Sequence, residues 1–486
     1  MAFAAAVVTR RETWLHRFLM HLACSKTFRM TLMGICVMLV GISMMQGKAL
    51  AEGDPTGAAT LEANPNAPVN FVWTLMAAFL VFFMQAGFAL LEAGSVRAKS
   101  TVNVLTKNVV DFLMCGMAFW AFGFAIMFGG SALSSGLEDG NDFFGSSGFF
   151  LAADAYDVTT FELWIFQMVF AATAATIVSG TMAERTKINA YMAYSFLISA
   201  LIYPVFGHWA WGGGWLGTMD TPFRDFAGSA VVHTVGGTAA LVGGLMVGPR
   251  IGKYGPDGKA RSIPGHSVTL VALGMLILFL GWFGFNPGST LAATDLRISV
   301  IAVNTFLAGV AGGIGAYYIR FIQTGKVDLV ATCSGIIGGL VAITAGCAFV
   351  ESWAAVVIGA IAGPIVVYGA SFLENVVKLD DPVWAVPCHM FCGLWGVLAV
   401  GIFADGTYLE VSGLIDGGSS QIVSQLIGMV AVVAWTAVTS ALVFGIIKAT
   451  MGLRVPEEDE IAGVDVTEHT QIAYPADDVE PTPALV

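Results

Sequence analysis

Two histidines interrupt long apolar stretches of this sequence: His233 within residues 228–237 (GSAVVHTVGG) and His389 within residues 386–396 (VPCHMFCGLWG). An ionisable side chain inside a membrane-spanning segment is energetically unfavourable, and is therefore a functional-site hypothesis by default. Burial opposes charging of an imidazole, and two neighbouring rings do not readily hold a proton each. A facing pair would share one proton, which suits proton relay, hydrogen bonding to a small neutral solute, or metal binding.

Metal binding is the weakest of these options. Cys392 lies three residues after His389 on one helical face, but no second Cys/His cluster or carboxylate completes a site at the usual spacing. We therefore expect no metal and no cofactor. Since no nucleophile–base set or cofactor motif is found either, the sequence indicates that the protein is not an enzyme. Two separately satisfied core histidines are the alternative that the residues alone leave open.

The composition shows what kind of element must hold the histidines. Hydrophobic residues make up 56% and charged residues 12% of the 486 residues, whereas a soluble domain has about 25% charged residues. A helix needs about 20 apolar residues to cross a bilayer. The sequence therefore predicts one all-α polytopic membrane domain with eleven spans, near residues 71–93, 104–129, 161–183, 189–211, 226–248, 267–287, 298–320, 329–348, 354–374, 384–403 and 421–448.

Residues 1–51 are typical of a signal peptide. Basic residues precede the apolar run 30–45, and Ala49-Leu50-Ala51 is an A-x-A cleavage signal. We predict cleavage after Ala51; an uncleaved twelfth helix is the alternative, and Met20 or Met30 is a candidate later start. The predicted division is a signal peptide at 1–51, an external segment at 52–70, the membrane domain at 71–450 and a cytoplasmic tail at 451–486.

The distribution of Lys and Arg predicts the orientation. The loops on one side of the predicted spans hold only Arg224 and Arg297. By the positive-inside rule, the mature N-terminus lies outside and the C-terminus in the cytoplasm. After Arg454 the tail carries nine acidic residues and no basic ones, and nothing in the chain suggests nucleic-acid binding. The basic residues of the opposite loops are Arg97, Lys99, Arg185, Lys187, Arg250, Lys253, Lys259, Arg261, Arg320, Lys326 and Lys378.

The predicted spans form two similar sets of five. The first span ends LEAGS (91–95) and the sixth ends FNPGS (285–289), while Gly237 and Gly393 each follow a histidine by four residues. Because five is an odd number, the second copy must be inverted in the membrane. Inverted repeats place their site near the midplane at the repeat interface. The two histidines are therefore expected to meet there, with the eleventh span outside the repeat.

Several motifs resemble those of the Amt/Mep/Rh ammonium transporter family. Residues 225–233 (DFAGSAVVH) resemble the family signature DFAGG-x-VVH, and residues 211–214 (WGGG) and 281–289 (GWFGFNPGS) are similar to further family motifs. Residues 380–382 (DDP) precede the second histidine at the family spacing, and residues 453–466 resemble the family's C-terminal region. The resemblance extends from about residue 70 to residue 475 and is greatest to the bacterial Amt branch.

The resemblance implies a homotrimer with one narrow pore through each subunit. It also implies a role for individual residues, which are as follows: Trp211, Ser289 and Phe170 form the outer recruitment site; Phe170 and Phe285 form a stacked gate below it; Trp282 lines the pore; Asp225 is the carboxylate near the outer site; and His233 and His389 are the twin-histidine pair. We expect Asp225 to cap a helix beginning at Phe226 and to hold the loop beneath the outer site, rather than to ligate the ion.

The chemistry of these residues suits ammonium. Aromatic faces at Trp211 and Phe170 attract a compact cation, and the Ser289 hydroxyl accepts an N–H hydrogen bond. Neutral ammonia crosses an apolar tube far more readily than its cation does. The expected route is therefore recruitment of ammonium, or of its analogue methylammonium, then deprotonation and passage of ammonia along the histidines. The sequence leaves open whether the proton follows by a separate relay.

The resemblance also implies partners and a location. It points to the inner membrane of a bacterium, with a PII-family signalling protein binding at the cytoplasmic face. An ammonium sensor that signals through its tail is the alternative function. Since the tail at 454–486 contains no output domain, a sensor would need a separate partner.

Overall fold

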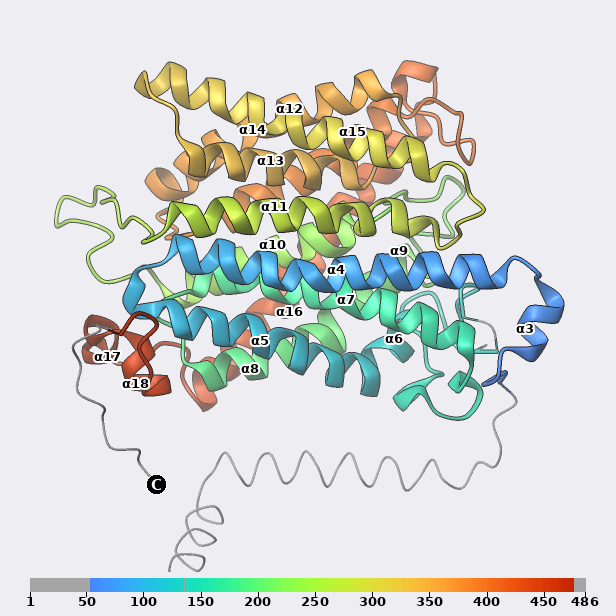
Figure 1. The fold of residues 1–486 in the computed structure, drawn as a ribbon, viewed down its shortest axis with the longest axis horizontal. Coiled ribbons are helices and arrows are strands. Elements are labelled where there is room, and N and C mark those ends of the chain that lie inside the picture. Colours follow the sequence, from blue (N-terminus) through green and yellow to red (C-terminus); the bar gives the residue numbers. More distant parts are fainter. Residues whose placement is uncertain (1–52, 135, 138, 476–486) are drawn as a thin grey trace, which may run out of the picture.

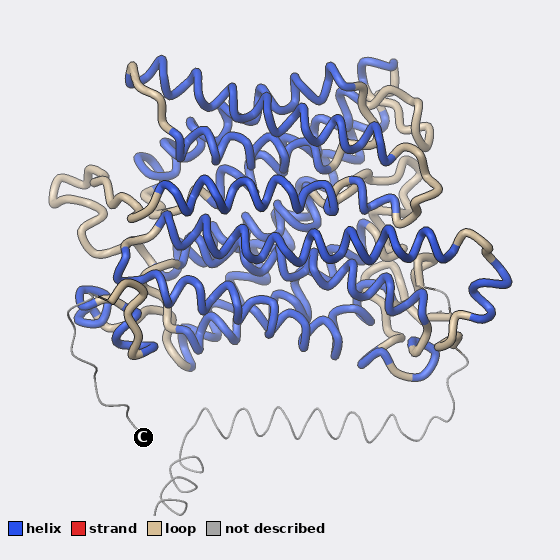
Figure 2. The backbone as a smooth tube through the Cα atoms, in the orientation of Figure 1, coloured by secondary structure: helices blue, strands red, loops and turns tan. Residues whose placement is uncertain are grey.

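The computed structural model describes residues 53–475 with the exception of 135 and 138. The predicted signal peptide and the last residues of the tail lie outside this part. Long helices run side by side along the horizontal axis of Figure 1, and loops join them at both ends of the bundle, as Figure 2 shows. No strand longer than an isolated bridge is found in the described residues. The prediction of an all-α membrane fold is confirmed.

Ten helices of the described part are long and apolar enough to cross a membrane. Several of them contain a π-helical turn, denoted η. Their segments are α4 (Ala67–Ser95), α5 (Thr101–Ala118) continued by α6 (Phe124–Phe128), α7 (Val158–Met182), α8 (Ile188–Leu197) continued by α9 (Tyr203–Ala210), η6 (Ser229–Thr234) continued by α10 (Val235–Val247), α11 (Val268–Phe285), α12 (Ile298–Thr324), α14 (Ser352–Phe372), η9 (Val386–Phe391) continued by α15 (Cys392–Phe403), and α16 (Ser420–Thr450).

The eighth predicted span, 329–348, is shorter than expected. Its helix α13 (Leu329–Thr344) has 16 residues, which reach about 24 Å at 1.5 Å per residue, less than the roughly 30 Å of hydrocarbon. The turns that follow α13 are buried, and Asn304 donates its amide to the carbonyls of Cys347 and Val350 at 3.0 and 2.8 Å. Irregular backbone is tolerated at membrane depth where protein surrounds it and satisfies its polar groups.

Helix packing reproduces the predicted five-helix repeat. In the first set α5 packs on α8, and α7 packs on both α4 and α10; in the second set α12 packs on α14, and α13 packs on both α11 and α15. Equivalent elements of the two sets also meet, α4 against α11 and η6 against η9. The interface between the repeats is therefore formed by the first helix of each set and by the turns that carry the two histidines.

The tail packs against one end of the bundle, called here the tail end (Figure 1). It contains two short helices, α17 (Glu457–Ala462) and α18 (Val464–His469). The carboxylate of Asp465 accepts the backbone N–H groups of Val102 and Asn103 at 2.9 and 2.8 Å, and Glu468 accepts that of Ile188 at 2.7 Å. These donors lie in the first turns of α5 and α8, so side chains of the tail cap two membrane helices.

A buried ionic cluster joins the two repeats at the tail end. Arg250 donates to both carboxylate oxygens of Asp380 at 2.8 and 2.9 Å, and also binds Glu184. Arg185 donates to the carbonyl of Asp380 at 3.0 Å. Although burial disfavours a charged carboxylate, the hydrogen bonds and charges of the two arginines hold the pKa of Asp380 well below its usual range. The cluster fixes the segment that leads into η9.

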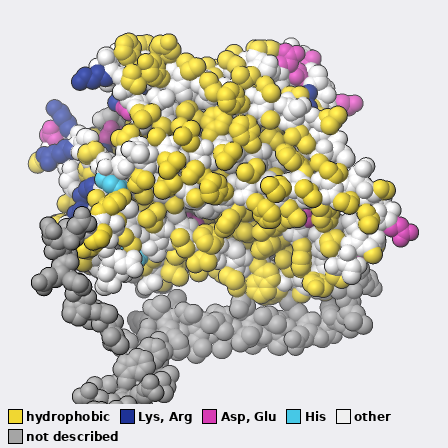
Figure 3. Space-filling view, in the orientation of Figure 1, with side chains coloured by type: hydrophobic (Ala, Val, Ile, Leu, Met, Phe, Trp, Pro, Cys, Tyr) yellow, Lys and Arg dark blue, Asp and Glu magenta, His cyan; other side chains and the backbone are white. Residues whose placement is uncertain are grey.

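The types of side chain on the surface change along the long axis of the bundle. Figure 3 shows hydrophobic side chains over the middle of the visible face, Lys and Arg mostly at the tail end, and Asp and Glu at the opposite end as well. Exposed apolar side chains lie along the long helices, for example Phe79 on α4, Leu276 on α11 and Val430 on α16. An apolar belt between two polar ends is what a bilayer requires.

Candidate functional site

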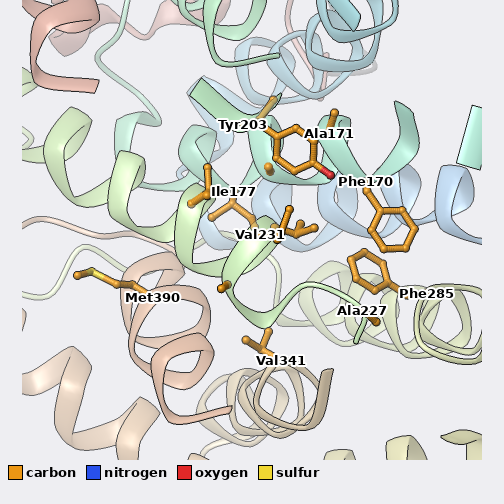
Figure 4. Packing of buried hydrophobic residues seen from close by; sticks show 14 of the residues in the cluster. Phe170, Ala171, Ile177, Tyr203, Ala227, Val231, Phe285, Val341 and Met390 are labelled. Atoms are coloured by element: carbon orange, nitrogen blue, oxygen red, sulfur yellow. The ribbon is translucent and has the colours of Figure 1, made fainter. Parts of the chain in front are cut away.

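A column of aromatic rings runs through the interface between the repeats. Phe170 of α7 stacks on Phe285 of α11, with ring centroids 4.1 Å apart and planes at 29°; Figure 4 shows these two rings side by side. The His233 ring stacks next, 5.4 Å from Phe285 at 22°, and the His389 ring follows 5.2 Å from His233 at 29°. All four residues are buried. The structure thus brings the predicted gate and the predicted histidine pair into one line.

The two histidines contact each other directly. Their Nδ1 atoms are 3.2 Å apart, and the residues are 0% and 5% exposed. Since a neutral imidazole carries one N–H, one ring must donate and the other accept. His208 is different: it is equally buried, but its ring nitrogens lie on the carbonyls of Met127 and Asn141 at 2.9 and 2.7 Å. His208 has the structural role that His233 and His389 lack.

Two glycines allow the histidine-bearing turns to cross closely. A Cβ at Gly237 would lie 2.4 Å from the backbone nitrogen of Met390, and a Cβ at Gly393 would lie 2.5 Å from the carbonyl oxygen of Ser229. Each glycine therefore abuts the opposite repeat, next to that repeat's histidine turn. The matching positions that suggested a repeat in the sequence are therefore points where the backbones of the two histidine turns approach closely.

Side chains of the inner faces line the column. Trp282 stacks beside His233, with centroids 5.3 Å apart at 21°, and its indole donates to Thr344 at 3.0 Å. Phe88 lies 6.3 Å from His389 on the side of the tail end. Trp282 therefore lies beside the ring column, with its orientation fixed by a hydrogen bond, and its pore-lining role stays a prediction.

The predicted recruitment site lies at the other end of the column. The ring of Phe170 meets Trp211 edge-on, with centroids 6.3 Å apart at 75°. Ser289 follows Phe285 by four residues and donates its hydroxyl to the Phe285 carbonyl at 2.8 Å, which leaves the oxygen lone pairs as acceptors. Trp211 and Ser289 are both partly exposed. The indole of Trp211, the ring of Phe170 and the hydroxyl of Ser289 thus lie near one end of the ring column, and their role in recruitment stays a prediction.

Asp225 is a helix cap. Its Oδ1 accepts the N–H of Gly228 at 3.0 Å, and its Oδ2 accepts those of Ala230 and Val231 at 2.8 and 2.9 Å. Its own carbonyl accepts the indole N–H of Trp211 at 2.7 Å. Burial raises the pKa of this carboxyl to about 6, although the backbone donors favour the ionised form. Asp225 therefore holds both the histidine turn and the entrance indole.

The helix that Asp225 caps starts later than predicted. It begins at Ser229 rather than at Phe226. The N–H groups of Phe226 and Ala227 instead bind the carbonyls of Ala345 and Thr344, at the C-terminal end of α13. Gly228 then adopts a left-handed conformation, with φ of 109°. Such a φ favours glycine, and it turns the chain into η6.

Asp381, which the sequence offered only as part of the motif at 380–382, is a second capping carboxylate. Asp381 accepts the N–H groups of Ala385 and Val386 at 3.0 and 2.9 Å at the start of η9, and burial raises its pKa to about 6. It precedes His389 by eight residues, as Asp225 precedes His233. The sequence therefore already contained a signal that Asp381 and Asp225 have equivalent roles: the same eight-residue spacing to a histidine. In each repeat an aspartate thus caps the turn that carries the histidine, and Asp225 is buried whereas Asp381 is partly buried.

A small cavity lies on the tail-end side of His389. Its volume is about 30 Å³, and its lining includes Phe88, Glu92, Ile177, Ser334 and His389. The presence of Glu92 was not predicted: this carboxyl is 2% exposed and lies within the predicted first span. An ionisable residue inside a span is itself a functional signal, and sequence reasoning passed over it.

The site offers no ready place for a metal. Within residues 53–475, without 135 and 138, no group of three or more His, Cys, Asp or Glu side chains is arranged to hold one. The Cys392 thiol points to the carbonyl of Ala362 at 3.7 Å.

Comparison with known proteins agrees with this geometry. The sequence profile described as the Ammonium Transporter Family matches residues 72–474. Ammonium transporter Amt2 of Archaeoglobus fulgidus is 50% identical over 442 residues, covering 88% of this chain and 92% of that protein. Ammonium transporter 1 member 3 of Solanum lycopersicum is 38% identical over 453 residues, covering 86% and 96% of the two chains.

Solved structures are similar as well. One named Sensor Amt Protein matches with a TM-score of 0.77 and 37% identity, over 84% of this chain and all of that one. Mep2 of Candida albicans matches with a TM-score of 0.72 and 28% identity, over 80% and 87% of the two chains. Since the profile and the relatives cover the repeats, the ring column and most of the tail, the chain belongs to the ammonium transporter family.

Proposed function

We propose that this protein carries ammonium across a membrane by splitting it into ammonia and a proton. Ammonium binds between Trp211, Phe170 and Ser289, loses its proton there, and passes as ammonia between the gate rings and along the histidine pair. The observation that carries this proposal is the ring column ending in the contact between two Nδ1 atoms at 3.2 Å. The proton crosses by a separate relay.

The entrance favours the cation. An indole or phenyl face attracts an ammonium ion by about 0.5–2 kcal/mol, depending on its desolvation, and the Ser289 oxygen accepts one N–H bond. The potassium ion has the same charge as ammonium but no N–H to donate. Directional acceptors at the entrance therefore distinguish the two ions, as hydrogen-bonding sites generally reject an analogue that leaves them unpaired.

The column favours the neutral molecule. Phe170 and Phe285 stack at 4.1 Å and leave no room between their faces, so passage requires at least one ring to rotate. Beyond them, the uncharged histidine pair offers both a donor and an acceptor to ammonia. A hydrated cation would lose its water here without a counter-charge, which is far less favourable than transferring ammonia.

Reconstitution in liposomes tests the proposal. We expect the wild type to show ammonium uptake with no potassium uptake, and His233→Ala combined with His389→Ala to lose that selectivity. His208→Ala is the matched control: it removes a buried histidine outside the column, so stability falls while selectivity is kept. Absence of ammonium or ammonia flux in the wild type would overturn the transporter proposal, and selectivity that survives the double change would overturn the filter role.

We further propose the assembly, orientation and partners that the resemblance implies. The protein is a homotrimer of the bacterial inner membrane, with residues 52–70 outside and the tail end in the cytoplasm. The loop 248–267, which projects at the tail end in Figure 1, carries the exposed basic residues Lys259 and Arg261. Its position and charge suit the approach of a PII-family protein. Cysteine labelling from each side, native mass measurement and binding assays with purified PII test these three points.

A sensor is the alternative function. It is favoured by the similarity to the structure named Sensor Amt Protein and by the tail, whose carboxylates cap α5 and α8. A sensor would bind ammonium with little or no flux and would change the exposure of its tail. The liposome experiment therefore separates the two functions when protease accessibility of the tail is measured with and without ammonium.

A further inference from the structure

A group of buried ionisable side chains lies inside the membrane-spanning helices and outside the ring column. They are Glu92 of α4, and Lys107 and Asp111 of α5, and they are 2%, 0% and 0% exposed. Lys107 and Asp111 lie one turn apart on α5, and α5 packs against α4, which carries Glu92. Intramembrane charges of this kind are rare and mark substrate or proton pathways more often than they stabilise a fold.

Hydroxyl and amide groups link the three residues. Ser179 donates to Glu92, and Ser179 lies one turn after Thr176 on α7. Thr176 donates to Asn108 at 3.0 Å, and Tyr191 donates to Asp111 at 2.9 Å. The groups form one contiguous polar patch between α4, α5, α7 and α8, separate from the aromatic rings.

The patch touches the column at one place. The small cavity below the histidine pair is lined by both His389 and Glu92. Since the Nδ1 of His389 is engaged with His233, its Nε2 is the nitrogen available to the cavity. A volume of about 30 Å³ exceeds the roughly 10–15 Å³ that a water molecule needs. The cavity can therefore place water between an imidazole and a carboxylate.

The other end of the patch reaches the tail. Asn103, Lys107 and Asp111 are spaced four residues apart, so they lie on one face of α5. Asn103 contacts His469 of α18 at 2.9 Å. Along this face the Lys107 amine and Asp111 Oδ1 are buried without a partner among the described residues. Buried polar atoms without partners are unfavourable unless they have a role.

The charge of the cluster suits the uptake of one proton. Two carboxylates and one ammonium group carry a net charge of about −1 when all are ionised, and one added proton makes the cluster neutral. The other charges that act on Lys107 are Glu468 of the tail and Arg185, which are opposite in sign. The cluster can therefore alternate between two states that differ by a single proton.

We propose that Glu92 accepts the proton from the histidine pair and delivers it to the Lys107–Asp111 face of α5, so that the proton, which ammonium has released at the outer end of the column, leaves the path of ammonia at the cavity below His389. The histidine pair first takes up the proton that ammonium has released, which gives one ring a second N–H bond. A His389 N–H bond then breaks and, through water, an O–H bond forms at Glu92, so that the pair is neutral again. Loss of that proton towards Asp111 restores the carboxylate, and no electrons are exchanged. The proton leaves at the Asn103–His469 end. This inference rests on the proposed transport function.

The test measures two quantities on the same proteoliposomes: the ammonium-evoked current and the uptake of radiolabelled methylammonium. We expect Glu92→Gln to lower the ratio of current to uptake by about a hundredfold, a typical loss for a positioned proton-transfer group, while uptake stays close to wild type. Glu92→Asp restores part of the current. Glu162→Gln is the matched control, because Glu162 is a carboxyl on α7 that does not line the cavity.

The outcomes separate this inference from the transport function itself. Wild-type uptake without current, or a Glu92→Gln protein with a wild-type ratio, would overturn the relay and leave transport standing. Absence of uptake in the wild type would overturn both. If the Glu92→Gln protein takes up no methylammonium, the same ratio of current to uptake is measured for Asp111→Asn. A ratio below that of the wild type supports the relay, and an unchanged ratio refutes it.

Discussion

Replacing Asp225 by alanine removes three hydrogen bonds at the start of η6. The carboxylate accepts N–H groups of Gly228, Ala230 and Val231 at 2.8 to 3.0 Å, and it is only 5% exposed, so water does not readily replace it. A hydrogen bond contributes about 1 kcal/mol, and more when one partner is charged. We therefore expect Asp225→Ala to lower the free energy of unfolding by about 3–5 kcal/mol.

The same substitution should disable transport indirectly. The carbonyl of Asp225 holds the indole of Trp211 at 2.7 Å, so a loosened cap releases one wall of the entrance and the turn that carries His233. Asp225→Asn keeps the shape and one acceptor oxygen, but presents an amide NH2 to backbone donors. We expect its stability and its ammonium uptake to fall between those of the wild type and the alanine variant.

Unfolding by SDS in mixed micelles, followed by tryptophan fluorescence, measures the stability, and uptake into proteoliposomes measures transport. Asp328→Ala is the control: its carboxylate caps α13 through Ala331 at 3.1 Å, far from the entrance. It should cost about 1 kcal/mol and leave uptake unchanged. An Asp225→Ala protein with wild-type stability but no ammonium binding would refute the capping argument and show that the carboxylate contacts the ion.

Three further predictions follow from other contacts. Gly237→Ala places a Cβ 2.4 Å from the nitrogen of Met390; the crowding should cost about 1–3 kcal/mol, separate the histidines and reduce measured uptake. Asp380→Asn leaves Arg250 without its main partner, and should cost about 3–5 kcal/mol at neutral pH. Because the folded-state pKa of Asp380 is lowered, this difference, measured by SDS unfolding, should shrink as the pH falls below about 4. Asp465→Asn weakens the cap on α5, should cost about 1 kcal/mol, and should speed proteolysis of the tail.

The fold class was within reach of the sequence because hydropathy and charge act locally. A run of apolar residues must become a helix in a bilayer whatever its neighbours do, and each of the eleven predicted spans corresponds to a helix. The eighth is the exception in length: α13 ends at Thr344 because the next residues are covered by protein and satisfied by Asn304. A local sequence pattern does not show that backbone groups will be covered by distant parts of the chain.

The residues of the candidate site could be predicted from the sequence, but their contacts could not. The types and spacing of His233 and His389 made them partners, and motif resemblance added the residues of the entrance and gate. Only the tertiary structure shows that their Nδ1 atoms meet, across 156 residues of chain. The contact depends on how closely Gly237 and Gly393 let two turns cross, which is a matter of backbone approach rather than of residue type.

The sequence by itself determined a membrane bundle with two repeats and a histidine in each, because hydrophobic length, charge bias and spacing are properties of short segments. The tertiary structure decided what those histidines touch. It placed Asp225 under η6 rather than under a helix from Phe226, and it brought Glu92 to the cavity beside His389. Contacts between side chains distant in sequence arise from packing between the repeats, and only the assembled fold fixes that packing.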